Sequence, residues 1–161
     1  MDIELVHQLR ATFRGEVISP DDPSYEQARK VFNGMVDRRP ALIARVRGVA
    51  DVVAAVKFAR DQNLPIAIRG GGHSVAGHGT CDGGFLIDLR NLRGVHVDPV
   101  AQTVTAQGGC NLGDLDNESQ LHGLVVPSGQ SAQISANEAT ADSAGSQRLR
   151  IVESIHGSLW K

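Results

Sequence analysis

A chain of 161 residues of which 41% are hydrophobic is long and apolar enough to bury the core of one domain. Its 16 basic and 18 acidic residues give a formal net charge of −2 without a long block of one sign, which argues against nucleic acid or an anionic membrane as partner. The acidic start of the chain and the absence of a long apolar run predict neither a secretory signal nor a membrane span, so we expect a cytoplasmic location.

The first third of the chain predicts two helices and a strand. Apolar residues at helical spacing from Ile3 to Phe13 predict an amphipathic helix. Ser24 and Gln27 have the spacing of a capping box, which predicts a short second helix running towards Asn33. The apolar run from Leu42 to Val46 then predicts a strand.

The middle of the chain predicts strands that alternate with a helix. From Val49 towards Asn63 apolar residues recur at helical spacing, and Asp51 lies in the first turn, where a carboxylate is favourable. A short strand from Pro65 to Ile68 passes directly into three glycines, and Phe85 to Leu89 predicts another buried strand.

The last third begins with a predicted β-hairpin, because apolar and polar residues alternate at 95–97 and 104–106 on either side of a turn. Asn111 and Asp114 predict the cap of a helix that Gly123 ends. Beyond Gly129 the regular pattern is lost. Residues 130–145 are small and polar and predict poor order, whereas 148–160 carry enough apolar side chains for one amphipathic helix.

The strand that ends at Ile68 is followed by Arg69-Gly70-Gly71-Gly72-His73-Ser74. Consecutive glycines let a backbone turn sharply and present successive N–H groups, which makes a concave anion site suited to a pyrophosphate. A Rossmann loop would need a helix directly afterwards, and none is predicted. Residues 75–84 contain four more glycines and no apolar period, so we expect a loop that lies against another part of the protein.

The residues of this loop leave several interpretations open. A bare triple glycine is most often a turn between two strands. The imidazole of His73 is suited to be a metal ligand, a base, a nucleophile towards an electron-poor cofactor ring, or only a solvated loop residue. A metal site formed by His73, His78 and Asp82 is a further alternative, because their spacing in a loop permits it without being diagnostic.

An ordered series of motifs lies on both sides of the loop. It comprises Phe32-Asn33-Gly34, Arg39-Pro40-Ala41, the helix from Val49 to Arg60, Arg69-Gly70-Gly71-Gly72-His73-Ser74, Gly77-His78-Gly79, Asp82-Gly83-Gly84, Ile87-Asp88-Leu89, Ala106-Gln107-Gly108-Gly109, and His122-Gly123-Leu124 up to Pro127. In the order and spacing of these motifs, residues 20–129 resemble the FAD-linked oxidases of the berberine-bridge and oligosaccharide-oxidase type. Their FAD domain is vanillyl-alcohol-oxidase-like and of the PCMH type.

The resemblance implies an α+β fold, the N-terminal part of a PCMH-type FAD-binding domain. It would have a small α/β subdomain, the start of a second mixed sheet and a poorly ordered C-terminal tail. The implied cofactor is FAD, with backbone amides around its pyrophosphate and His73 bonded to the 8α-methyl carbon of the flavin. Such a bond would raise the flavin's potential. The implied cofactor-binding residues are Arg69, Gly70, Gly71, Gly72, His73, Ser74, Gly77 and His78, the last of which either contacts the cofactor or orders the loop.

Other polar residues are better interpreted as structural. Cys81 and Cys110 are too far apart for a metal knuckle and too few for a disulfide framework, so we expect reduced, packed thiols. Some members of the family attach the flavin a second time through a cysteine, but residues 128–132 contain none. Asp88 and Asp114 are interpreted as turn and cap residues rather than catalytic acids.

The resemblance ends at Gly129, before the second glycine-rich stretch and the substrate domain of the family. We therefore expect residues 1–129 to be a partial FAD-binding domain and residues 130–161 a divergent tail, disordered or altered in reading frame. No catalytic residue is predicted. The function implied is that of an FAD-dependent oxidoreductase, an oxidase, which would act on a small-molecule substrate only where a further domain completes it. The alternative is a non-catalytic remnant, or a nucleotide-binding module without turnover, which the physics favours for the isolated chain.

Overall fold

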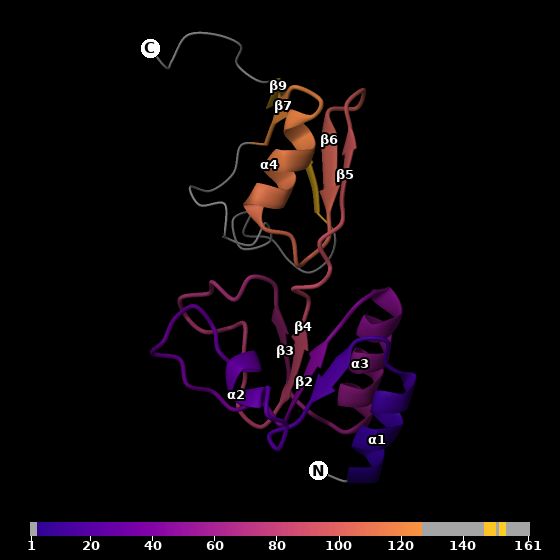
Figure 1. The fold of residues 1–161 in the computed structure, drawn as a ribbon, viewed down its shortest axis with the longest axis vertical. Helices are drawn as coiled ribbons and strands as arrows, with labels where there is room; N and C mark the ends of the chain where they lie inside the picture. Colours follow the sequence, from indigo (N-terminus) through magenta and orange to yellow (C-terminus); the bar gives the residue numbers. More distant parts are fainter. Residues whose placement is uncertain (1–2, 127–146, 151, 154–161) are drawn as a thin grey trace. The chain divides into compact units, whose positions relative to one another are not determined.

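The computed structural model describes residues 3–126, 147–150 and 152–153, and the chain divides between Leu92 and Arg93 into two compact units (Figure 1). The first unit contains one four-stranded sheet. Its strands are β1 (Glu16–Ile18), β2 (Leu42–Arg45), β3 (Ile66–Arg69) and β4 (Phe85–Asp88), in the order β1-β2-β4-β3. Strands β2, β4 and β3 are parallel, and β1 is antiparallel to β2.

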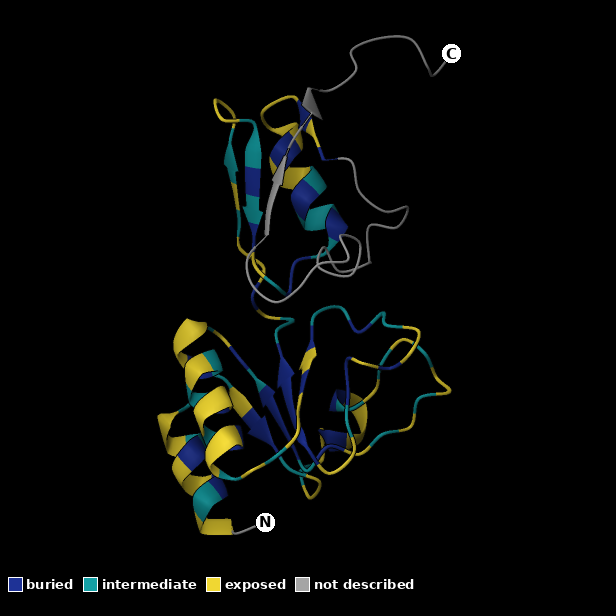
Figure 2. Ribbon diagram, turned by 180° about the vertical axis from the view of Figure 1, so that it is seen from behind, coloured by how far each residue is buried: buried dark blue, intermediate teal, exposed yellow. Residues whose placement is uncertain are grey.

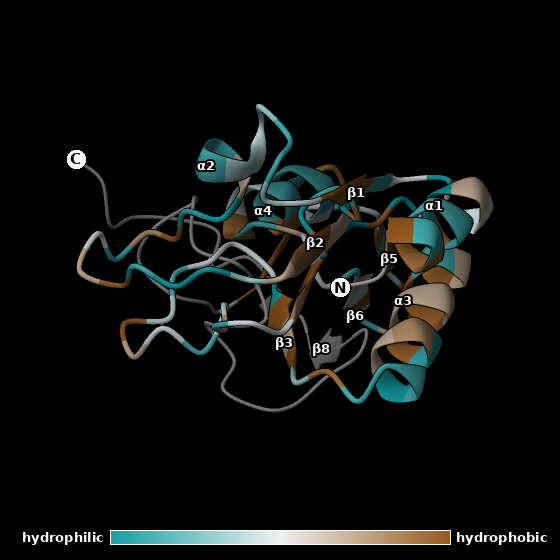
Figure 3. Ribbon diagram, turned by 90° about the horizontal axis from the view of Figure 1, so that it is seen from below, coloured by the Kyte–Doolittle hydropathy of each residue, from teal (hydrophilic) through white to brown (hydrophobic). Residues whose placement is uncertain are grey.

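Helices cover both faces of this sheet because its central strands are apolar on both sides. Helix α1 (Ile3–Thr12) and helix α3 (Val49–Asp61), which connects β2 to β3, cover one face, and α2 (Tyr25–Ala28) packs on the other. All four residues of β4 are buried, as expected for a parallel strand between two layers (Figure 2). The apolar residues of β2 and β3 are shown in brown in Figure 3. The core therefore lies on both sides of β4.

The parallel arrangement brings three strand ends to one edge of the sheet. Arg45 and Arg69 are each in register with Asp88, so the segments that follow β2, β3 and β4 leave from the same edge. In open α/β sheets, ligands bind outside the carboxyl ends of the strands. This edge is therefore where a site is expected.

In the second unit, β5 (Val95–Asp98) and β6 (Thr103–Ala106) form a hairpin, and β8 (Gln147–Arg150) pairs antiparallel with the other side of β6. A second pair joins β7 (Leu124–Val125) to β9 (Val152–Glu153). Helix α4 (Leu112–Gln120) buries Leu112 and Leu115 against the hairpin. Asn111 and Asp114 form the predicted cap, in which each side chain accepts the backbone N–H of the other residue.

Most predicted elements are present, and three predictions need correction. Strand β1 was not expected. Helix α2 ends at Ala28, and Ser24 makes no capping hydrogen bond because its backbone is already helical. In place of one helix over 148–160, the described residues 147–150 and 152–153 are strands, and they pair with β6 and β7. The remainder of that segment, and residues 130–145, lie outside the described residues.

No helix among the described residues combines the length and the apolar character that crossing a bilayer would require.

Candidate functional site

The glycine loop, residues 70–84, leaves the carboxyl end of β3 and lies against residues 29–40, as the sequence predicted. Backbone contacts join the two segments: Phe32 N–H donates to the Gly72 carbonyl at 3.0 Å and Gly83 N–H to the Arg39 carbonyl at 2.9 Å. The guanidinium of Arg38 donates to the carbonyls of Gly77 and Thr80 at 3.1 and 3.0 Å. The loop therefore has a fixed course although it has no helix or strand of its own.

Two glycines are needed where the loop packs closely. Gly72 has φ +80°, and a Cβ there would lie 3.3 Å from Cδ of Arg69. Gly77 has φ +76°, and a Cβ there would lie 2.9 Å from Cγ1 of Val36. The positive φ disfavours a larger residue at both positions, and at Gly77 there is also too little space for a Cβ.

Backbone donors at the start of the loop are available to a ligand. Gly70 and Gly71 are half-buried, and within residues 3–126 their N–H groups donate to no protein acceptor. An N–H group that is partly removed from water favours an external acceptor. With Gly72 in the left-handed conformation, this stretch of side-chain-free backbone fits a pyrophosphate, whose oxygens accept hydrogen bonds from successive amides.

The side chain of Arg69 is buried beneath the loop. It is 1% exposed and donates to the carbonyl of Ala28 at 2.7 Å, to the carbonyl of Lys30 at 3.1 Å and to Oδ2 of Asp88 at 2.7 Å. Its Nε has no hydrogen-bond partner in the described part of the chain. Arg69 was predicted to bind the cofactor, but its guanidinium is bound to protein groups and its carbonyl accepts the N–H of Leu89 at 2.8 Å. The structure therefore gives it the role of holding the start of the loop.

Asp88 is more than the turn residue that the sequence suggested. Oδ1 does accept the N–H of Arg90, at 3.2 Å, as a turn residue would. The carboxylate is also fully buried and binds the guanidinium groups of Arg69 and Arg90, each at 2.7 Å from Oδ2. Burial alone would raise the pKa of Asp88, but hydrogen bonds and charge from Arg90 and Arg69 outweigh it and hold that pKa below its ordinary value. Asp88 is therefore ionised and anchors the end of β3.

The two histidines of the loop have different surroundings. His73 is half-buried, and its ring centroid lies 4.9 Å from that of Phe32, with the planes tilted by 37°. His78 is exposed, and its backbone N–H donates to Oγ of Ser74 at 3.2 Å. The alternative of a metal site with Asp82 is not assembled: within the described residues no three His, Cys, Asp or Glu side chains are grouped for a metal ion, and Asp82 accepts the N–H of Arg39 at 2.8 Å.

Both cysteines are free thiols, in agreement with the sequence-based prediction. Cys110 is fully buried and its Sγ donates to the carbonyl of Gly94 at 3.3 Å. Burial raises the pKa of Cys110 to about 11 and also raises the pKa of Cys81. A thiol with a raised pKa is a weak nucleophile, so neither cysteine is suited to attack a cofactor.

Comparison with known proteins gives a consistent match. The family model described as "FAD binding domain" matches residues 40–157, which extends into the segment for which the motifs predict a divergent tail. The (R)-6-hydroxynicotine oxidase of Paenarthrobacter nicotinovorans is 36% identical over 123 residues, which are 76% of this chain and 27% of that protein. An FAD-linked oxidoreductase of Dictyostelium discoideum is 35% identical over 127 residues, 78% of this chain and 28% of that protein.

Solved structures agree with this. The crystal structure of 6-hydroxy-D-nicotine oxidase from Arthrobacter nicotinovorans matches with a TM-score of 0.73 and 35% identity, over 77% of this chain and 27% of that one. A berberine-bridge-enzyme-like protein of Physcomitrella patens matches with a TM-score of 0.74 and 25% identity, over 81% of this chain and 29% of that one. The chain thus spans little more than a quarter of the length of the relatives that it matches.

Proposed function

The chain belongs to the family of FAD-binding domains, of the type found in FAD-linked oxidases, and from this premise we propose that its glycine loop holds the pyrophosphate of FAD. The N–H groups of Gly70 to Ser74 would donate to the phosphate oxygens. The observation that carries the proposal is the side-chain-free backbone at the carboxyl end of β3, where Gly70 and Gly71 have N–H groups without protein acceptors among the described residues.

We further propose that a ring nitrogen of His73 forms a covalent bond to the 8α-methyl carbon of the flavin. In support, the imidazole is fixed beside Phe32 and is half-buried, so its position is defined while part of the ring stays accessible. Gly77 and His78 complete the site: Gly77 closes the turn over Val36, and exposed His78 provides an outer contact.

A bound flavin supplies the hydride acceptor for the oxidation of a small molecule. We propose that the residues of this chain contribute binding and orientation of the cofactor, and that turnover takes place where the remaining length of the family's proteins is present. The names of the relatives indicate that they act on different substrates.

The covalent bond is tested by reconstituting the full chain with FAD, denaturing it in acid and separating it by gel electrophoresis. Flavin fluorescence should stay with the protein band in the wild type and in His78→Ala, and should be lost in His73→Ala. His78→Ala is the matched control, because it removes an imidazole from the same loop. A band without fluorescence in the wild type, or fluorescence retained in His73→Ala, would contradict the bond to His73.

Reversible binding is tested separately by titrating FAD before denaturation and following the quenching of flavin fluorescence. Gly72→Ala should weaken binding, because a Cβ at φ +80° distorts the loop where it packs on Arg69. Gly34→Ala is the control, since nothing lies within 4 Å of a Cβ at Gly34. Equal affinities of the wild type and Gly72→Ala would refute the glycine loop as the cradle. If the chain binds FAD but forms no covalent bond to it, its function would be that of the alternative considered above, a nucleotide-binding module.

A further inference from the structure

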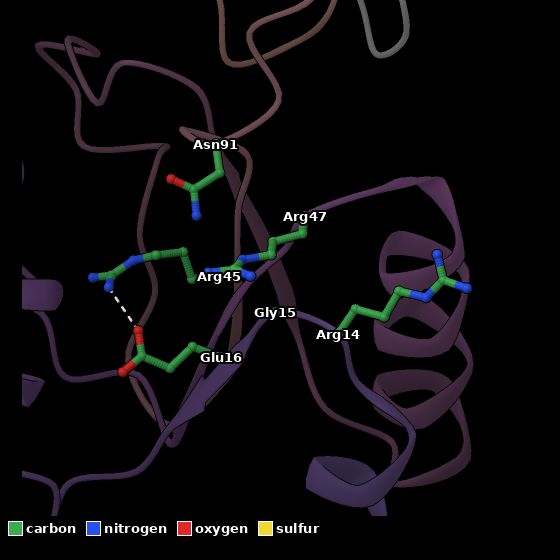
Figure 4. Close-up of a pocket in the computed structure, with 6 residues that line it drawn as sticks. All are labelled: Arg14, Gly15, Glu16, Arg45, Arg47 and Asn91. Atoms are coloured by element: carbon green, nitrogen blue, oxygen red, sulfur yellow. Dashed lines mark hydrogen bonds and ion pairs between the residues drawn. The ribbon is translucent and has the colours of Figure 1, made fainter.

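A hollow of about 340 Å³ opens at the carboxyl end of β2, separate from the glycine loop and formed entirely by the first unit (Figure 4). Its lining is almost wholly polar: Arg14, Gly15, Glu16, Arg45, Arg47 and Asn91. The volume is at the lower end of the range for small-molecule sites, about 300 to 1,000 Å³. Its polar lining suits a small polar ligand.

Arg45 and Arg47 at the end of β2 and Asn91 after β4 bring three side chains to the hollow, and Arg47 and Asn91 are exposed. In Figure 4, Arg47 and Asn91 point towards Arg45, whereas the side chain of Arg14 extends away over α3. Arg45 binds Oε2 of Glu16 at 2.7 Å, and its Nε lies 3.7 Å from Oδ2 of Asp88. Neither the guanidinium of Arg47 nor the amide of Asn91 has a hydrogen-bond or ion-pair partner among residues 3–126.

Buried contacts fix the walls of the hollow. The carboxylate of Asp51, which is 2% exposed, accepts three backbone N–H groups: those of Arg14 at 3.0 Å, Gly15 at 3.1 Å and Arg47 at 2.8 Å. A Cβ on Gly15 would lie 2.1 Å from the carbonyl oxygen of Arg45, so only glycine lets the two segments approach this closely. Backbone contacts therefore hold the arginine-bearing segments together, in addition to the ion pair between Arg45 and Glu16.

The balance of charge in the hollow favours an anion. The guanidinium groups of Arg45 and Arg47 line the hollow with the carboxylate of Glu16. The other two carboxylates nearby already have partners, Asp51 in three backbone N–H groups and Asp88 in Arg69 and Arg90. A guanidinium group matches the geometry of phosphate oxygens with two parallel hydrogen bonds. The NH₂ group of Asn91 adds a neutral donor.

We propose that this hollow binds a phosphate group, with Arg47 and Asn91 as its ligands and Arg45 as a shared partner. The inference rests on the charges and contacts of the first unit and is independent of flavin binding. The phosphate could be free or be carried on a larger molecule as a monoester, and two probes distinguish these sources.

The test is calorimetric titration of the full chain with inorganic phosphate, and with phenyl phosphate as the monoester, at low ionic strength because screening weakens exposed charge pairs. Arg47→Gln should weaken binding at least about tenfold, and Asn91→Ala about threefold. Arg60→Gln is the matched control: it removes the same charge from an arginine on α3 whose side chain is 72% exposed and, within residues 3–126, is bound only to its neighbour Asp61. The affinity of Arg60→Gln for each probe should equal that of the wild type.

Glu16→Gln is expected to change the affinity for phosphate in the opposite direction, which a folding defect would not do. It releases Arg45 from its carboxylate partner and removes a negative charge beside the anion, so binding should tighten about threefold. Tighter binding of phenyl phosphate than of phosphate would identify a monoester as the ligand, and the reverse a free anion. The proposal is overturned if the wild type binds neither probe, or if Arg47→Gln binds both as well as Arg60→Gln does.

Discussion

Asp88→Asn removes a buried charge at the carboxyl end of β4 while keeping the size of the side chain. Asp88 is fully buried and Arg69 is 1% exposed, with 2.7 Å between Oδ2 and the guanidinium. Leaving a buried charge without its partner costs about 3 to 5 kcal/mol. Arg90 is 40% exposed and screened by water, so losing its pair with Asp88 adds at most about 1 kcal/mol. We therefore expect the free energy of unfolding to fall by about 4 kcal/mol.

Urea unfolding of the full chain, followed by circular dichroism, measures this loss. Asp61→Asn is the control, because it removes the same charge from a side chain that is 60% exposed, and it should change the free energy of unfolding by less than about 0.5 kcal/mol. A loss below about 1 kcal/mol in Asp88→Asn would refute the reasoning, since Arg69 would then tolerate its burial without the carboxylate.

The same variant has a defined pH dependence. The pKa of Asp88 in the folded protein lies below its ordinary value of 3.8, so the folded state binds the proton more weakly than the unfolded state does. The stabilisation is therefore complete above about pH 4 to 5 and is lost as the pH falls through the folded-state pKa. The difference in stability between the wild type and Asp88→Asn should shrink below pH 4 and stay constant near neutrality. A difference that grew in acid would contradict this assignment.

Four further variants are measured by the same unfolding assay. Asp51→Ala should cost about 3 kcal/mol, because three backbone N–H groups lose one buried acceptor, and a loss under about 1 kcal/mol would show that water replaces it. Gly77→Ala should lower the free energy of unfolding more than Gly83→Ala does. Both positions need a positive φ, which costs alanine about 1 kcal/mol, but only at Gly77 does the added Cβ contact Val36. Equal losses of stability in the two variants would exclude the clash with Val36. Asn111→Ala should cost about 1 kcal/mol through loss of the α4 cap, and faster hydrogen exchange should be confined to that helix.

The sequence predicted those elements whose periodicity is local. The helix after Val49 and the hairpin around residues 98–102 follow from patterns within a few residues of one another. Helix α2 shows the limit: Ser24 has a capping residue's chemistry, yet Tyr25 is fixed by a hydrogen bond from its hydroxyl to the carbonyl of Pro40 at 2.7 Å, and that tertiary contact helps to set the local backbone. Strand β1 forms by pairing with the edge of β2, and no short sequence pattern predicts that pairing.

The candidate site was predictable in part for the same reason. The glycines of the loop were recognisable because a residue without a side chain is informative by itself, and positive φ values explain why Gly72, Gly77 and Gly83 are needed. The partner of Arg69 could not be predicted from the sequence, since Asp88 lies 19 residues further along the chain and is placed beside Arg69 only by the register of β3 and β4. One signal was present: a carboxylate directly after the apolar Phe85-Leu86-Ile87 run is costly to bury alone and therefore implies a cationic partner.

This pairing explains how a side chain buried in the sheet can belong to a cofactor-binding motif. Arg69 is the last residue of β3, and its guanidinium is bound to Asp88 on β4 and to the carbonyls of Ala28 and Lys30. These contacts fix the point at which the backbone enters the glycine loop, and Gly72 then packs on the stem of the same arginine. A loop that binds through backbone amides cannot correct its position by rotating side chains, so its accuracy depends on how rigidly its first residue is held. In the cofactor site that we propose, the ion pair would supply that rigidity, so its role would be to position the amides and not to touch the phosphate.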